Sequence, residues 1–323
     1  MPLVGAAGIG SMLGSGIIIG LSATITVWQS GLGLTDGQVG ILSGALTFAI
    51  AAGSLLAGNI TKLFGLIRSF NMMNLMYLIG AAICVLSGNF PVLLAGLIIT
   101  GFASGADLPI SLTVISHDAP NEKVSASLIA STQVFWQIGV LGSYAMAFIV
   151  SHVEGAAGAR MVFALLAVLA GIAFVWRTFS KKFKEFHAAG DEYRAAEGTK
   201  TSTEVSFASL FKGTDGKKYV SFFSCIIIFY VCWNLLANTF GQFQTYILVK
   251  ANASQSLATG CGIVLNIVGL ICGILFASAA GSKHRNKFFY VGIVIQAGAM
   301  IGIALGGGTI AMIVGMIACY NIG

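Results

Sequence analysis

The chain consists of long hydrophobic runs separated by short polar stretches. Ten of these runs approach the roughly 20 apolar residues that are needed to span about 30 Å of bilayer hydrocarbon. They cover approximately Leu3–Trp28, Val39–Phe64, Phe70–Leu86, Phe90–Ser116, Val124–Val150, Arg160–Phe179, Tyr219–Val249, Leu257–Ala280, Phe288–Leu305 and Thr309–Gly323. This pattern predicts an all-α membrane protein with about ten transmembrane helices.

One polar stretch is much longer than the others. Ser180–Lys218 opens with several lysines and continues through polar sequence that contains Gly and Thr, which is typical of a linker. Six hydrophobic runs precede it and four follow. We therefore predict a six-helix N-terminal bundle at residues 1–179, a cytoplasmic linker at 180–218 and a partial four-helix C-terminal bundle at 219–323.

Composition and charge placement agree with a membrane protein. Only 9% of the residues are charged and the mean hydropathy is +0.91, values far from those of a soluble domain. If the N-terminus is cytoplasmic, all but Arg160 and Lys250 of the 17 lysines and arginines lie in cytoplasmic loops and flanks. This bias follows the positive-inside rule and predicts a multi-pass protein of the cell (inner) membrane with no nucleic-acid partner.

Asp107 is the one acidic residue deep within an apolar run. A charge at mid-helix costs about 2.5–3.5 kcal/mol on insertion scales, so such residues usually face a pathway. At 1.5 Å per residue, Asp107 lies about 5–6 Å to the cytoplasmic side of the bilayer midplane. Burial favours the neutral acid unless a cation or water relieves it, which suits a proton-coupling carboxylate. The alternative is a structural acid that bonds backbone freed at Pro109.

Amide and indole side chains gather in other runs. Gln133 and Gln137 share one helix face in the fifth run, and Trp136 adjoins them. The candidates in the seventh and eighth runs are Trp233, Asn234, Asn238, Gln242 and Asn266. Because amides both donate and accept hydrogen bonds and an indole stacks on a sugar ring, this set predicts binding of a polyhydroxylated substrate. The alternative is that these side chains join neighbouring helices.

The missing features also restrict function. No lysine or arginine is placed within a span core, Arg160 being at an edge, so a neutral sugar or polyol is favoured over an anion. The cysteines and histidines show no metal-ligand spacing, and the sequence contains no Walker loop, zincin helix or nucleophile elbow. We expect no metal, no cofactor and no enzymatic activity.

Two short basic loops occupy equivalent places in the two halves. The first, Gly58–Arg68, contains Lys62 and Gly65 and is a candidate cytoplasmic gate loop, and the second is Gly281–Lys287. Repeated units of this kind are common in transporters. A second half equal to the first would need two further spans after Gly323, so we expect a C-terminal truncation.

This plan resembles the major facilitator superfamily, whose members usually have twelve spans in two six-helix bundles. The stretch Gly101–Leu112, followed by Asp118–Pro120, is similar to the fourth span of its bacterial sugar and metabolite transporters. Phe135–Gln137 and Trp233–Gln242 are similar to the same group. The resemblance implies transport by alternating access between two bundles.

The sequence departs from that family in three places. Lys62 stands where the gate loop commonly has an Asp, Met12–Ile17 has no acid where the first span often carries one, and the last two spans are missing. The fifth span also lacks the Gly-Pro pattern associated with antiporters. The sequence thus predicts a monomeric proton symporter of a neutral sugar or polyol, with Asp107 as the coupling residue. The alternative is a truncated, non-transporting membrane protein or sensor with the same fold.

Overall fold

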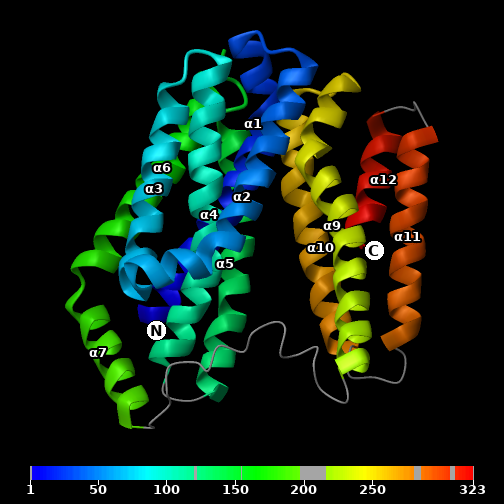
Figure 1. The fold of residues 1–323 in the computed structure, drawn as a ribbon. Coiled ribbons are helices and arrows are strands. Elements are labelled where there is room, and N and C mark those ends of the chain that lie inside the picture. Colours follow the sequence, from blue (N-terminus) through cyan, green and yellow to red (C-terminus); the bar gives the residue numbers. More distant parts are fainter. Residues whose placement is uncertain are drawn as a thin grey trace.

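The computed structural model describes residues 2–119, 122–153, 155–196, 216–279, 285–305 and 310–322. Within these ranges the chain forms eleven helices (Figure 1). They are α1 (Pro2–Leu32), α2 (Asp36–Phe64), α3 (Leu66–Leu86), α4 (Phe90–Asp118), α5 (Glu122–Ile149), α6 (Ala157–Phe179), α7 (Lys181–Ala196), α9 (Gly216–Lys250), α10 (Gln255–Ala279), α11 (Arg285–Leu305) and α12 (Ile310–Ile322). All of them except α7 coincide with the ten predicted hydrophobic runs, and six in the described part are long and apolar enough to cross a membrane.

Local sequence signals start two of the long helices. The Thr35 hydroxyl accepts the Gln38 backbone N–H (3.2 Å), and the Gln38 side chain accepts the Thr35 N–H (2.9 Å) at the start of α2. At the start of α4, the Asn89 side chain accepts the Val92 N–H at 3.1 Å. These caps satisfy N–H groups that have no partner within the helix.

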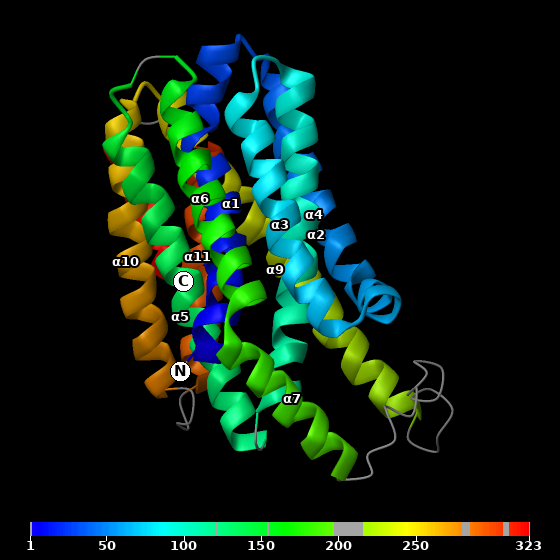
Figure 2. The same cartoon turned by 90° about the vertical axis from the view of Figure 1, so that its left-hand side faces the viewer.

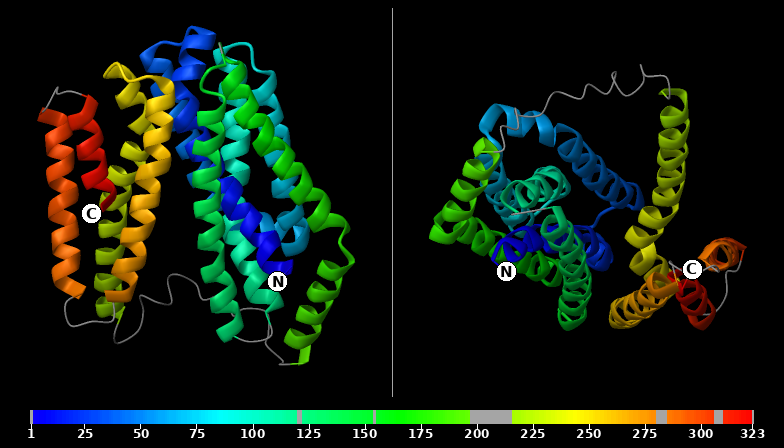
Figure 3. Two further views of the ribbon diagram at one scale, coloured as in Figure 1. Left: turned by 180° about the vertical axis from the view of Figure 1, so that it is seen from behind. Right: turned by 90° about the horizontal axis from the view of Figure 1, so that it is seen from below.

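The helices fall into two groups, α1–α6 and α9–α12, which lie side by side (Figures 1 and 3). The main core of the first group surrounds α1 and includes Leu13, Ile17, Trp28 and Phe163. The second group has a core of its own around Leu248. This arrangement confirms the predicted two-bundle, all-α fold.

Hydrogen bonds between the groups gather at the end of the molecule away from the N-terminus. Thr26 donates to the Gln255 side chain (2.6 Å), and Gln255 donates to the Ala23 carbonyl (2.7 Å). Ser22 donates to the Gly241 carbonyl (2.8 Å). If the N-terminus is cytoplasmic, these contacts close the outer end of the boundary between the bundles.

Charged side chains join the groups at the same end. Asp36, at the start of α2, accepts hydrogen bonds from Lys250 (3.1 Å) and Tyr246 (2.9 Å), both on α9. The Lys250 and Asp36 side chains are about half and two thirds exposed, so water and salt screen this pair. This exposed part of the closure can therefore break at small cost, whereas the Thr26–Gln255 and Ser22–Gly241 bonds are partly buried.

Two expected loops are more ordered than predicted. The linker at 180–218 begins with the helix α7, which continues beyond α6 at the end that holds the N-terminus (Figure 2). Residues 197–215 of the linker and 280–284 of the second basic loop lie outside the described residues. In the first half, Gly65 alone separates α2 from α3, with φ at +84°. The candidate gate residues Gly58 and Lys62 therefore lie in α2, and Arg68 lies in α3.

Candidate functional site

The helix α4 continues without a break through Pro109. Because proline has no N–H, the carbonyl of Gly105 four residues earlier loses its helical donor. The Ser54 hydroxyl of α2 donates to that carbonyl at 2.8 Å. Ser54 therefore satisfies the freed backbone group, and the alternative role of Asp107 as its hydrogen-bond partner is wrong.

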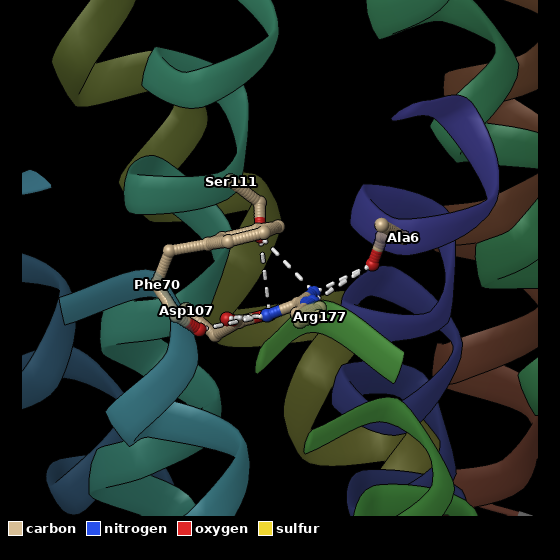
Figure 4. Close-up of polar contacts among 5 residues, drawn as sticks. All are labelled: Ala6, Phe70, Asp107, Ser111 and Arg177. Atoms are coloured by element: carbon tan, nitrogen blue, oxygen red, sulfur yellow. Dashed lines mark hydrogen bonds and ion pairs between the residues drawn. The ribbon is translucent and has the colours of Figure 1, made fainter. Parts of the chain in front are cut away.

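Asp107 instead forms a buried ion pair with Arg177 of α6 (Figure 4). Nη1 of Arg177 lies 2.6 Å from one carboxylate oxygen, and Nη2 lies 3.3 Å from the other. Asp107 is 4% exposed and Arg177 is 2% exposed. Ser111, one turn further along α4, donates to the same carboxylate at 3.2 Å. A guanidinium that donates to both carboxylate oxygens is the strongest form of such a pair.

Backbone and aromatic groups complete the surroundings of Arg177. Nε and Nη2 donate to the Ala6 carbonyl at 3.1 and 2.7 Å, and Nη1 donates to the Phe70 carbonyl at 3.0 Å (Figure 4). The Phe70 ring lies 3.8 Å from the guanidinium carbon, a cation–π contact. With its amide oxygen turned toward Arg177, Asn74 accepts from Nη1 (2.7 Å) and Nε (3.0 Å). Each nitrogen of the cation thus has an acceptor, which is the condition for burying it.

The helix α1 passes unusually close to this pair. A Cβ atom on Gly10 would overlap the Asp107 carboxylate and would lie 2.8 Å from Nη2 of Arg177. Only glycine leaves room for the approach at this position. The partners of the pair come from α1, α3, α4 and α6, so the pair lies inside the first bundle and away from the boundary between the bundles.

The position of the Arg177 side chain corrects one expectation. The sequence places no cation within a span core, but this side chain is buried inside the first bundle. Arg177 lies near the end of α6, but side chains of a helix tilt toward its N-terminus, so this one reaches back into the bundle. That tilt is the signal that could have identified the partner of Asp107. Because the two charges cancel, the pair offers no net charge to an anionic solute.

The candidates on α5 lie toward the second bundle. Trp136 packs in an apolar cluster that includes Ile263 of α10, and its carbonyl accepts a hydrogen bond from Ser15 of α1 at 2.7 Å. Gln137 is half-buried and Gln133 is exposed on the same helix. Trp136 therefore takes part in a cluster that contains residues of both bundles, as a substrate path requires.

The candidates on α9 are divided between two roles. Asn238 donates to the Asn234 side chain, and Asn234 donates to the Tyr230 carbonyl at 2.9 Å, so these two amides form a short chain along the helix. Gln242 is buried and donates to Thr47 of α2 at 2.7 Å. Gln242 thus joins the two bundles in this conformation, whereas the Asn234 and Asn238 pair remains largely accessible.

Two further candidates contribute less to the site. Asn266 donates to the Gly262 carbonyl of its own helix at 2.8 Å. Trp233 lies within α9, but its side chain is outside the described part of the structure.

A cavity of about 400 Å³ near α10 is lined by Phe148, Val264 and other mainly apolar side chains, which do not suit a polyol.

Comparison with known proteins decides the family. A family model described as Major Facilitator Superfamily matches residues 4–323. The chain belongs to the major facilitator superfamily. Among curated relatives, it is 30% identical over 292 residues to the "Minor myo-inositol transporter IolF" of Bacillus subtilis (strain 168), a match that covers 88% of this chain and 64% of that protein. The chain thus spans somewhat under two thirds of the length of this relative.

Other comparisons agree. The chain is 26% identical over 153 residues to "D-xylose-proton symporter-like 2" of Arabidopsis thaliana, which covers 46% of this chain and 30% of that protein. Among solved structures, the partially occluded inward open conformation of the xylose transporter XylE from E. coli matches with a TM-score of 0.70 at 14% identity, over 99% of this chain and 84% of that one. The nucleoside transporter NupG matches with a TM-score of 0.67 at 13% identity, over 100% and 79%. These structural matches show a shared fold.

Proposed function

We propose that this superfamily member is a secondary transporter that moves a neutral sugar or polyol by alternating access. The observation that carries the proposal is the way the two bundles meet. In the described part, the hydrogen bonds between them include contacts such as Thr26–Gln255 and Asp36–Lys250 at one end of the boundary. Exposed contacts such as Asp36–Lys250 contribute about 0–1 kcal/mol each, so they can break and re-form during a transport cycle.

The solute class follows from the side chains near the boundary. Gln137 on α5 and the Asn234–Asn238 pair on α9 offer amide donors and acceptors without a charge, and Trp136 offers an aromatic surface. Hydroxyl groups of a sugar or polyol match this set. The names of the relatives, an inositol transporter and a xylose-proton symporter, support the same class.

Asp107 is our proposed proton carrier, with Arg177 as its counter-ion. When Asp107 takes up a proton, Arg177 loses one charged partner but keeps three neutral acceptors, the carbonyls of Ala6 and Phe70 and the amide of Asn74. The cation therefore stays bound in the first bundle while the carboxyl becomes neutral. The ion pair can in this way exist in a paired and a protonated state, which coupling to a proton gradient requires.

We also propose that the protein acts as a monomer in the cell (inner) membrane, with a cytoplasmic N-terminus. The end at which the bundles are joined by hydrogen bonds is then the outer end. The inner ends of α2 and α3, with Lys62 and Arg68, form the cytoplasmic gate.

Uptake into proteoliposomes tests this proposal. The protein should exchange myo-inositol or xylose in counterflow, and a pH gradient should drive accumulation of up to about tenfold per pH unit for one proton per solute. The double variant Asp107→Asn, Arg177→Gln keeps a neutral, hydrogen-bonding pair, so we expect it to retain counterflow and lose pH-driven accumulation. Glu185→Gln on the exposed face of α7 is the matched control and should keep both activities.

Each result has a distinct meaning. Absence of counterflow by the unaltered protein with every neutral sugar and polyol tested would contradict transport of this class. Counterflow together with undiminished pH-driven accumulation in the double variant would remove Asp107 from proton coupling. Loss of both activities in Glu185→Gln as well would show that the assay reports damage to the protein.

A further inference from the structure

A second cluster of ionisable side chains lies where α7 packs on the end of α4. The α7 residues Phe183, His187 and Gly190 recur at helical spacing and are buried, whereas the neighbouring Lys182 and Lys184 are exposed. Phe183 enters the apolar cluster that also contains Ile115 of α4. One face of α7 is therefore docked on the first bundle, and the opposite face is free of it.

Asp118, the last residue of α4, lies at the centre of this contact. Its side chain is fully buried and accepts hydrogen bonds from two imidazoles, Nδ1 of His117 at 2.7 Å and Nδ1 of His187 at 2.5 Å. A Cβ atom on Gly190 would lie 2.9 Å from His117 and 3.0 Å from the Asp118 carboxylate, so α7 approaches as closely as a glycine allows. A buried carboxylate held by two histidines joins the two helices.

His117 also faces a second carboxylate. Its Nε2 atom lies 3.2 Å from Oδ1 of Asp191, which is on α7 and is 76% exposed. A neutral imidazole has one N–H, so it can donate to Asp118 or to Asp191, but not to both. With a carboxylate oxygen near each ring nitrogen, the imidazolium can donate to both, whereas the neutral ring can donate to one. His187 contacts Asp118 through one nitrogen, so its neutral form is sufficient.

The structure leads us to infer that α7 is a pH-sensitive latch, docked on α4 while His117 is protonated and released when His117 loses its proton. Release of the proton leaves a lone pair of His117 opposite a carboxylate, which turns an attraction into a repulsion. Docking binds one proton more than the undocked state, so by linkage it strengthens as the pH falls and weakens as the pH rises. Histidine is the side chain whose charge changes near cytoplasmic pH.

The neighbouring elements contribute no other charge to His117 in the described part. α1, which also packs against α7, has no titratable side chain between Pro2 and Leu32. On α5, Glu122 and Lys123 have side chains outside the described part. The charged groups that face His117 are thus Asp118 from α4 and Asp191 from α7. The latch does not depend on the proposed transport function, because its two states differ only in whether α7 is docked on α4.

Hydrogen–deuterium exchange of the full chain in lipid nanodiscs, corrected for the intrinsic pH dependence of exchange, tests the latch. We expect the protection of α7 amides to fall by up to tenfold per pH unit between pH 6 and pH 8, while α3 amides in the same sample keep theirs. Asp191→Asn should remove the pH dependence and leave α7 protected at pH 8, because the new amide can donate to a neutral His117. The matched control Glu192→Gln, at the next position, should behave like the unaltered protein.

The outcomes are separable. Equal α7 protection at pH 6 and pH 8 in the unaltered protein would overturn the latch, as would an unchanged pH dependence in Asp191→Asn. His187→Asn keeps a donor toward Asp118 and should retain the pH dependence, which assigns the titration to His117. A variant that also lost α3 protection would be damaged as a whole and could not test the latch. Imidazole nitrogen NMR of the unaltered protein would then show whether His117 is protonated at pH 6. A neutral His117 at that pH would overturn the inference.

Discussion

Removing one partner of the Asp107–Arg177 pair should cost far more stability than removing both. We consider Arg177→Met, Asp107→Leu and the double variant, all of which replace polar groups by apolar ones of comparable bulk. The two side chains are 6% exposed or less, so solvent screening does not reduce the effect. Breaking a buried pair at one partner typically costs about 3–5 kcal/mol, whereas replacing both partners by apolar residues is often nearly neutral.

The surroundings of the ion pair make the expected loss of stability differ between the two single variants. In Asp107→Leu, the Arg177 cation keeps the carbonyls of Ala6 and Phe70 and the ring of Phe70, so we expect a loss at the lower end of that range, about 3 kcal/mol. In Arg177→Met, Asp107 keeps only the Ser111 hydroxyl among the donors seen here. The carboxylate is then buried with a single neutral donor, so we expect a loss at the upper end of that range, about 4–5 kcal/mol.

Reversible unfolding in mixed detergent and SDS micelles, followed by tryptophan fluorescence at pH 7, measures these differences. We expect the double variant to lie within about 1.5 kcal/mol of the unaltered protein, which gives a coupling energy of roughly 5 kcal/mol or more. If the two single losses simply added in the double variant, the ion pair would not exist as described.

Two other predictions concern close packing around α4. Gly10→Ala should destabilise the protein by about 1–3 kcal/mol, because its methyl group overlaps the Asp107 carboxylate, whereas Gly44→Ala, with open space around it, should be neutral or stabilising; melting temperatures in detergent compare the two. Ser54→Ala should cost about 1–3 kcal/mol in SDS unfolding, because the Gly105 carbonyl then has neither its helical donor nor the serine hydroxyl. A melting temperature unchanged by Gly10→Ala, or a neutral Ser54→Ala, would show that α1 or α2 lies further from α4 than the structure places it.

The substrate candidates show how far a sequence pattern reaches. Helical spacing correctly places Asn234 and Asn238 on one face of α9, where they hydrogen-bond to each other. Spacing alone cannot show that Gln242, one turn further along α9, donates its side-chain amide to Thr47 of the opposite bundle. Periodicity fixes which side chains share a face of one helix, but the partner across the boundary depends on how two helices far apart in the sequence meet.

The sequence by itself determined the class of this protein. Runs of about 20 apolar residues can be satisfied in a bilayer only as helices, because backbone N–H and C=O groups find no water there. The long polar interruption divides these runs into two sets, and Asp107 is conspicuous because hydrocarbon tolerates so few charges. These conclusions rest on local composition, which a sequence displays directly.

Only the tertiary structure decided what the ionisable residues do. Arg177 is 70 positions from Asp107 and at the end of a helix, yet packing of α6 beside α4 makes it the counter-ion. The polar linker likewise gave no sign that its first helix would bring His187 and Asp191 to the end of α4. The strength of a charge interaction depends on distances of a few ångströms and on burial, and both are set by helix packing across long separations in sequence.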